Sequence, residues 1–216
     1  HSFAFRNLCP EEKLIELWLP QHSEFRLKSL ELSDEATIAP YNDIRPRWIT
    51  YGSSITHCRS AERPSLTWPA IVAREHGLNV TCLGYGGNCH LEPMIARMIR
   101  DLPADFISIK IGINVQGNSS LNARTFKPAV IGFVEIIREK HPYVPFVVVS
   151  PIYSPPRELI PNTVGLSLQD IREEVESAVK ALQAHGDSNI YYVDGLKLFG
   201  SEYSNFLPDE LHPDAE

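Results

Sequence analysis

The chain has 216 residues and 43% of them are hydrophobic, which is enough to bury a full core in one α/β domain with a small extra module. Its formal net charge is -7 with no Lys/Arg cluster, which argues against nucleic acid or an anionic membrane surface as partner. No apolar run approaches the length of a membrane span.

The cysteines are too few to be needed as staples in a chain of this size. Cys9, Cys58, Cys82 and Cys89 form no CxxC pair, so we expect reduced thiols and, from that, a cytoplasmic location. The chain begins with His and no signal-like segment precedes its first strand, so we expect a trimmed N-terminus with any targeting information removed.

The first segment alternates apolar and polar residues. Residues 13–20 and 24–32 are predicted to be strands with one wet face each, joined by the short link 21–23. Two or three such strands do not form a stable sandwich by themselves. We therefore interpret residues 1–44 as the remnant of a larger N-terminal β-sandwich module.

After Pro46 the pattern changes to strand, loop and helix in repetition. Short apolar runs without sustained alternation predict buried parallel strands, and helical spacing predicts the helices between them. The strands are expected at 48–51, 80–83, 106–111, 146–149 and 190–193, and the helices at 67–77, 91–101, 125–141 and 168–185. Residues 45–216 should therefore form a three-layer α/β/α sandwich around a five-stranded parallel sheet.

The last helix carries its own start and stop signals. Ser167 lies three residues before Asp170, as expected of an N-cap, and Gly186 follows as its C′ residue.

Four polar blocks stand where ligands bind such a sheet, beyond the carboxyl ends of its strands. They are Gly52-Ser53-Ser54-Ile55-Thr56, Gly84-Tyr85-Gly86-Gly87-Asn88, Gly112-Ile113-Asn114 and Asp209-Glu210-Leu211-His212. Taken singly, each is more often an ordinary turn or an exposed acidic tail. Together they supply a serine nucleophile, a histidine base and an aspartate to orient that base.

Acyl transfer also requires donors for the negative charge that develops on the carbonyl oxygen. The candidates are the Ser54 and Gly87 backbone N–H groups and the Asn114 side-chain amide.

From about residue 47 to its end, the chain resembles the SGNH (GDSL-like) hydrolases, whose fold is flavodoxin-like. The resemblance implies Ser54, Asp209 and His212 as the catalytic triad and Ser54, Gly87 and Asn114 as the oxyanion hole. The chain departs from the family pattern at Ser53 and Val115, where the family usually has aspartate. The absence of these two carboxylates removes polar support from the site. Because the family usually continues into a closing helix after the histidine, we also expect the chain to be a fragment of a longer protein.

The preceding strands and the stretch 51–57 are similar to the SGNH subgroup with an N-terminal β-sandwich, which includes esterases and an acyltransferase. An α/β-hydrolase is disfavoured, because its nucleophile elbow requires glycine where Thr56 stands and its acid and base lie far apart.

The resulting hypothesis is a serine esterase or acylhydrolase that cleaves small acyl esters, including esters of carbohydrates, through an acyl-serine intermediate without any cofactor. The alternatives are an acyltransferase with an alcohol acceptor and a catalytically eroded carbohydrate-binding protein. The oligomeric state stays open.

The substrate-binding candidates are His57, Asn88, His90 and Tyr153, and Arg59, Arg63 and Arg157 are candidates for an acidic substrate group. The pairs His57-Cys58 and Cys89-His90 contain a possible zinc set. Their spacing matches no common zinc pattern, so we expect pocket lining and no metal.

Overall fold

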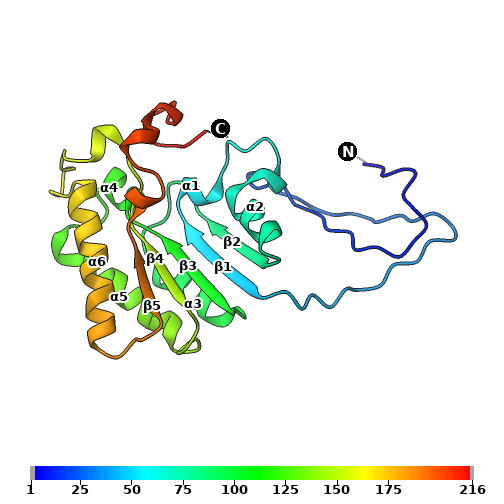
Figure 1. Cartoon of the computed structure of the whole chain (residues 1–216), viewed down its shortest axis with the longest axis horizontal. Coiled ribbons are helices and arrows are strands. Elements are labelled where there is room, and N and C mark those ends of the chain that lie inside the picture. The colour runs from blue at the N-terminus through cyan, green and yellow to red at the C-terminus, as the bar shows by residue number, and fades with distance from the viewer. Residues whose placement is uncertain (1–2, 215–216) are drawn as a thin grey trace.

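The computed structural model describes residues 3–214 and has a parallel sheet of five strands at its centre (Figure 1). The strands are β1 (Arg47–Gly52), β2 (Asn79–Gly84), β3 (Phe106–Lys110), β4 (Phe146–Val149) and β5 (Ile190–Val193). Their order across the sheet is β2-β1-β3-β4-β5. The predicted strands are confirmed, each within one residue at either end.

The helices are α1 (Ser54–His57), α2 (Trp68–Glu75), α3 (Pro93–Asp101), α4 (Ile113–Asn118), α5 (Ala123–Arg138) and α6 (Leu168–Ala184). The four longer helices that were predicted are confirmed, with ends that differ by three residues or fewer. Helices α1 and α4 were not predicted, because each is too short for an apolar period and begins directly in the loop after a strand.

Helix α6 begins and ends as its sequence indicates. The Ser167 hydroxyl accepts a hydrogen bond from Asp170 N–H, and the Asp170 carboxylate accepts one from Ser167 N–H, which completes a capping box. At the other end Gly186 has φ +104°, a conformation that costs glycine little. These contacts fix the position of a helix that packs against β4 and β5.

The sheet is covered unequally on its two faces. Tyr51, Ile107, Ile109 and Val148 share one core with apolar side chains of α3, α5 and α6, and the Tyr51 and Phe133 rings stack at 5.1 Å. The opposite face carries Trp48, which packs on Trp68 of α2 at 5.9 Å between ring centroids. This distribution follows from the right-handedness of the connections between parallel strands. The chain crosses the sheet toward one edge from β1 to β2 and toward the other edge from β2 onward, so α2 packs on one face and the later helices pack on the other.

The position of the candidate site follows from the point in the sheet where the chain reverses the direction in which it adds strands. The chain leaves β1 and β3, the two strands on either side of the reversal, toward opposite edges of the sheet. Ligands of open α/β sheets bind in the crevice at this point, beyond the carboxyl ends of the strands. Ser54 follows β1 and Asn114 follows β3, so the order of the strands brings the first and third blocks together.

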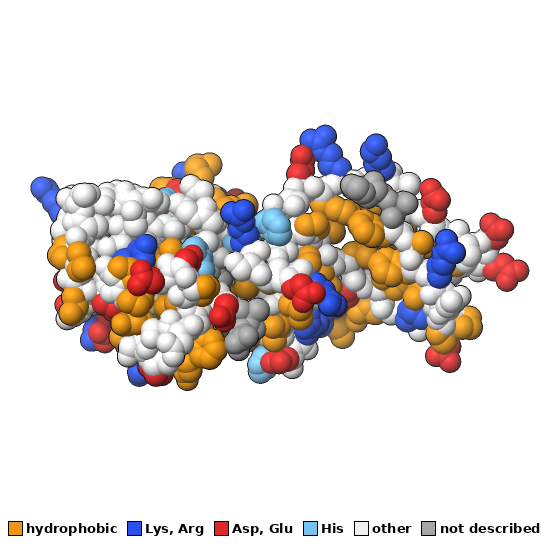
Figure 2. All heavy atoms as spheres, turned by 90° about the horizontal axis from the view of Figure 1, so that it is seen from above, with side chains coloured by type: hydrophobic (Ala, Val, Ile, Leu, Met, Phe, Trp, Pro, Cys, Tyr) orange, Lys and Arg blue, Asp and Glu red, His pale blue; other side chains and the backbone are white. Residues whose placement is uncertain are grey.

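The strands predicted at 13–20 and 24–32 are wrong for this structure. The described part of the N-terminal segment, residues 3–44, contains no strand and extends away from the sheet (Figure 1). Many of its apolar side chains are exposed, and Figure 2 shows hydrophobic atoms gathered along it. An alternating pattern makes one face apolar, but a strand forms only when a neighbouring strand takes its backbone hydrogen bonds.

Several contacts join this segment to the domain, and one of them is between His57 Nε2 and the Gln21 carbonyl. Arg45 pairs with Glu16 at 2.5 Å, and the Arg74 guanidinium lies 5.9 Å from the centre of the Trp18 ring. Gln21 donates a side-chain hydrogen bond of 3.1 Å to the Ala61 carbonyl.

Among the residues described, no helix has the length and hydropathy needed to cross a membrane.

Candidate active site

The turn after β1 presents Ser54 at the first position of α1. The Ser53 hydroxyl caps this helix by accepting a hydrogen bond of 3.3 Å from Ile55 N–H, and Ser53 itself is fully buried. A side chain at Gly52 would collide with Thr56 and approach the Lys110 carbonyl, so the turn requires glycine there. Ser53 thus supplies a cap at the position where the resemblance leads us to expect aspartate.

Ser54, His212 and Asp209 form a continuous hydrogen-bonded chain. The Ser54 Oγ lies 2.7 Å from His212 Nε2, and His212 Nδ1 lies 2.6 Å from Asp209 Oδ2. An ionised carboxylate only accepts hydrogen bonds, so the ring carries its proton on Nδ1 and leaves Nε2 free to accept from the serine. This is the tautomer that a general base toward Ser54 needs.

The Asp209 carboxylate is held in its ionised form by its hydrogen bonds. Burial raises its pKa, but donation from the His212 backbone, the His212 ring and the Leu211 backbone outweighs burial, and the net pKa is lowered. The Oδ1 atom accepts the His212 N–H at 2.7 Å and the Leu211 N–H at 3.1 Å. Both oxygens are therefore occupied by donors from the same short loop.

Asn114 is oriented by the loop that follows β2. Its Oδ1 accepts a hydrogen bond of 3.1 Å from Cys89 N–H, which directs the amide nitrogen away from that loop. Within residues 3–214, the Asn114 Nδ2 group donates to no other residue, and neither do the N–H groups of Ser54 and Gly87. The three donors expected in an oxyanion hole are therefore all unused by the protein.

Gly87 has φ +75°, which only glycine adopts readily. Its carbonyl is held by Asn118 Nδ2 and by His90 Nε2, each at 3.1 Å. The second His90 nitrogen lies 2.8 Å from Ser120 Oγ. This clamp fixes the peptide between Gly87 and Asn88. The preceding peptide, which carries the Gly87 N–H, is held through its Gly86 carbonyl by Asn88 Nδ2 at 3.0 Å.

The sequence profile of the GDSL-like lipase/acylhydrolase family matches residues 46–215. The chain belongs to this family. Among solved structures it is similar to salicylyl-acyltransferase SsfX3 from a tetracycline biosynthetic pathway, with 41% identity and a TM-score of 0.72 over 79% of this chain and 50% of that chain. A search of curated proteins gave no match.

Two further structures share the fold. A putative GDSL-like lipase from Bacteroides ovatus is 24% identical with a TM-score of 0.68, over 81% of this chain and 50% of that one. A family two carbohydrate esterase from Clostridium thermocellum is 18% identical with a TM-score of 0.58, over 73% and 56%. The chain thus spans about half the length of the first two structures.

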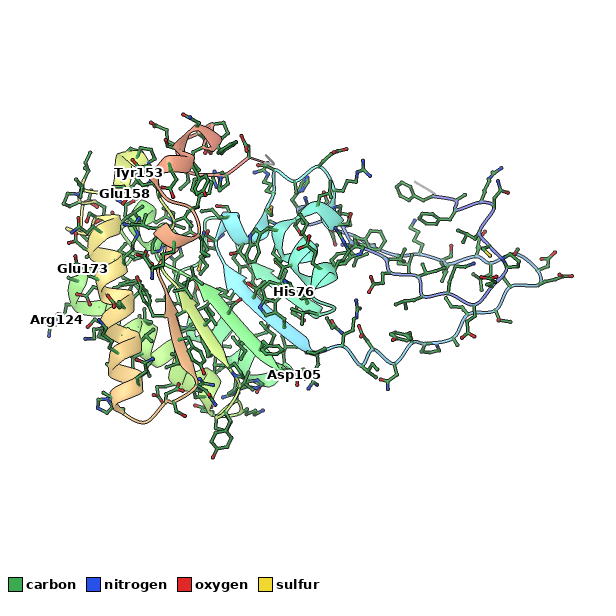
Figure 3. All side chains as sticks on the ribbon, in the orientation of Figure 1. His76, Asp105, Arg124, Tyr153, Glu158 and Glu173 are labelled. Atoms are coloured by element: carbon green, nitrogen blue, oxygen red, sulfur yellow. The ribbon has the colours of Figure 1, made fainter. Side chains whose placement is uncertain are left out.

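The other substrate-binding candidates make contacts within this chain. His57 Nε2 contacts the Gln21 carbonyl of the N-terminal segment, and Asn88 Nδ2 donates to the Gly86 carbonyl at 3.0 Å. His90 supports the Gly87 loop as described above. Tyr153 donates its backbone N–H to the Phe199 carbonyl, and its side chain is half-buried at the edge of the domain seen in Figure 3. Their roles toward substrate stay predictions.

The Cys and His pairs beside the blocks are not arranged around a common point. Within the described residues, no group of three His, Cys, Asp or Glu side chains is placed to hold a metal ion. Cys89 is buried, and burial raises the pKa of its thiol to about 12, so it stays protonated at neutral pH.

Sequence reasoning missed the residues that support the loop after β2. The Tyr51 hydroxyl accepts from Leu91 N–H at 3.3 Å and donates to Glu92 at 3.2 Å. The same Glu92 oxygen accepts His90 N–H at 3.2 Å. The only signal in the sequence is an acidic residue directly before Pro93, and nothing there shows its partner in β1.

Val115 occupies the family's usual aspartate position and is fully buried in the core. Apolar packing therefore stands directly after Asn114, where the resemblance leads us to expect a carboxylate. The support for the Asn114 amide comes from Cys89 N–H alone among the described contacts.

Lys110, at the end of β3, should make stability depend on pH. Its side chain is half-buried at the end of the strand, and burial lowers the pKa of its ammonium to about 7. The pKa in the unfolded chain is about 10.4, so between about pH 7 and that value the unfolded state binds more protons and stability rises with pH. The Lys110→Met variant should melt at a higher temperature than wild type at pH 7, with the difference closing toward pH 10.

Thermal unfolding of both proteins across this pH range measures the effect. Lys28→Met, in the exposed N-terminal segment, is the matched control and should leave the pH dependence unchanged. A difference between Lys110→Met and wild type that is the same at every pH would contradict the assignment.

Proposed function

We propose that the chain is a serine-dependent carboxylic ester hydrolase that acts on small acyl esters, with Ser54, His212 and Asp209 as its triad. The observation that carries the proposal is the unbroken contact from Ser54 Oγ through the His212 ring to Asp209, at 2.7 and 2.6 Å. A lone serine hydroxyl is a weak nucleophile, and this arrangement supplies the base and the group that orients it.

The reaction follows from the geometry. Ser54 Oγ attacks the ester carbonyl while His212 Nε2 takes its proton, and the carbonyl oxygen becomes negatively charged. The N–H groups of Ser54 and Gly87 and the Asn114 amide bind that oxygen, because no protein acceptor competes for them in the described chain. His212 then protonates the departing alcohol, which leaves an acyl group on Ser54.

Water completes the cycle by attacking the acyl-serine, with His212 again taking a proton. The Asp209 and His212 side chains are 53% and 34% exposed, so solvent reaches the base directly. This exposure gives water access to the acyl-enzyme, which supports hydrolysis.

Acyl transfer to an alcohol acceptor is the second candidate. It is supported by the 41% identity to the salicylyl-acyltransferase. In this chain the transfer would use the same residues, with an alcohol in place of water. The two reactions separate when p-nitrophenyl acetate is turned over in the presence of increasing alcohol. Acyl transfer gives the ester of the added alcohol, whereas hydrolysis gives only acetate.

Labelling by a fluorophosphonate tests whether the protein is an enzyme at all. The reagent should attach covalently to Ser54, as located by mass spectrometry, because it reacts with a serine that an adjacent base activates. Hydrolysis of p-nitrophenyl acetate should be lost in parallel. A folded protein that is not labelled would favour the eroded carbohydrate-binding alternative.

The N-terminal segment is proposed to belong to a β-rich module, the feature of the sandwich-bearing SGNH subgroup. Its alternating sequence and its exposed apolar side chains support this reading, because such a face is normally covered by further strands.

The four cysteines are free thiols, which supports a cytoplasmic location.

A further inference from the structure

The loop that carries Asp209 and His212 lies at the surface and needs support from elsewhere. Glu210, between the two, has φ +60°, a left-handed conformation that is uncommon for a residue with a side chain. Its N–H donates to the Leu207 carbonyl at 3.0 Å, and Leu207 is buried. The direction in which the loop presents the His212 ring therefore depends on what holds the Glu210 peptide.

Ser154 holds that peptide from the segment after β4. Its hydroxyl donates to the Glu210 carbonyl at 2.7 Å, and its side chain is buried. Arg157 Nη1 donates to the same hydroxyl oxygen at 2.9 Å. Because the guanidinium occupies a lone pair of Oγ, the single hydroxyl proton is directed at Glu210. This use of Arg157 differs from the recognition of an acidic substrate for which it was a candidate.

The support continues into the body of the domain through an ion pair. Ser154 N–H donates to Glu158 Oε1 at 2.9 Å, and Arg172 of α6 makes two hydrogen bonds of 2.8 Å to the Glu158 carboxylate. Arg172 also donates from Nε to the Pro151 carbonyl at 2.9 Å. The Arg172 and Glu158 side chains are only 8% and 16% exposed, so the pair is a fixed part of the fold. Glu158 lies beside Tyr153 at the edge of the domain that faces the C-terminal segment (Figure 3).

We infer that Ser154 is a positioning residue for the catalytic loop, anchored through Glu158 to Arg172 and acting through the Glu210 carbonyl on the orientation of His212. The inference rests on the proposed function, since it concerns the same base. Ser154 touches no reacting atom. It acts by restricting the loop, and a misplaced base lowers the rate of proton transfer even when substrate still binds.

Ser154→Ala removes the donor to Glu210 with little change in volume. We expect kcat for p-nitrophenyl acetate to fall on the order of 10- to 100-fold with KM nearly unchanged, because the base and not the substrate is misplaced. Ser150→Ala is the matched control. Ser150 is also a buried serine after β4, and its hydroxyl contacts Tyr192 and Gly195 N–H, far in sequence from the catalytic loop. The control should lose comparable thermal stability and keep its kcat.

A second readout does not depend on turnover. The proton between His212 Nδ1 and Asp209 should give a far-downfield NMR signal in wild type and in Ser150→Ala, and it should broaden or vanish in Ser154→Ala as the loop becomes mobile. If wild type shows this signal but has no esterase activity and resists the fluorophosphonate, the proposed function fails while the positioning role is still measured.

Three results would overturn the inference. The first is a folded Ser154→Ala protein with the kcat and the downfield signal of wild type, and the second is an equal loss of kcat in Ser150→Ala. If Ser154→Ala does not fold, Arg157→Met is the alternative variant, because Arg157 is only half-buried and its loss removes the hydrogen bond that orients the Ser154 hydroxyl. We expect a smaller loss of kcat in the same direction. An unchanged kcat and signal in Arg157→Met is the third.

Discussion

Replacing Ser54 by alanine should lower kcat for a small acyl ester on the order of 10⁶-fold, close to the loss that removal of a triad serine or histidine produces in other serine hydrolases. The physical reason is that Ser54 Oγ, which lies 2.7 Å from His212 Nε2, is the nucleophile that this base activates, and alanine removes it. Steady-state rates of the purified variant, with folding checked by circular dichroism, measure the effect.

The companion variant His212→Ala should show a similar loss, and the double variant should be little worse than either. Serine and base act as one unit, so the second substitution removes a function that the first has already abolished. Losses that multiply would mean that one of the two residues is misassigned.

Replacing Asn114 by alanine should lower kcat on the order of 10² to 10³-fold, or about 3 to 4 kcal/mol, with KM changed only slightly. Negative charge exists on the oxygen only after attack, so a donor aimed at it stabilises the transition state more than the bound ester. The contact from Cys89 N–H to Asn114 Oδ1, at 3.1 Å, leaves the amide nitrogen as the group available for this role.

Asn114→Asp is the matched variant that separates catalysis from loop shape. The aspartate keeps an oxygen for Cys89 N–H but offers a second oxygen in place of the donor, so it should be at least as harmful as alanine. If Asn114 only shaped its loop, aspartate would be tolerated better than alanine. A near-normal kcat in a folded Asn114→Asp protein would therefore remove Asn114 from the oxyanion hole.

The N-terminal segment shows where sequence pattern fails. Residues 13–20 alternate as cleanly as many strands do, yet the structure gives them no strand partner. Alternation reports which face of a strand is apolar, but pairing depends on a second segment at the right distance and in the right register. The buried runs after Pro46 were predicted correctly, because their β-branched composition and the helices between them have one compact solution.

The sequence by itself determined the local elements of this protein: the parallel strands, the longer helices, the Ser167–Asp170 cap and the four polar blocks at the strand ends. Only the tertiary structure decided how these blocks meet. The Ser54–His212 contact joins residues 158 positions apart, and the support of the catalytic loop by Ser154, Glu158 and Arg172 depends on three segments that no sequence period relates. Local signals arise from steric and hydrogen-bonding preferences within a few residues. The long-range contacts form only when the strands have assembled in the order β2-β1-β3-β4-β5 and α6 has packed against β5.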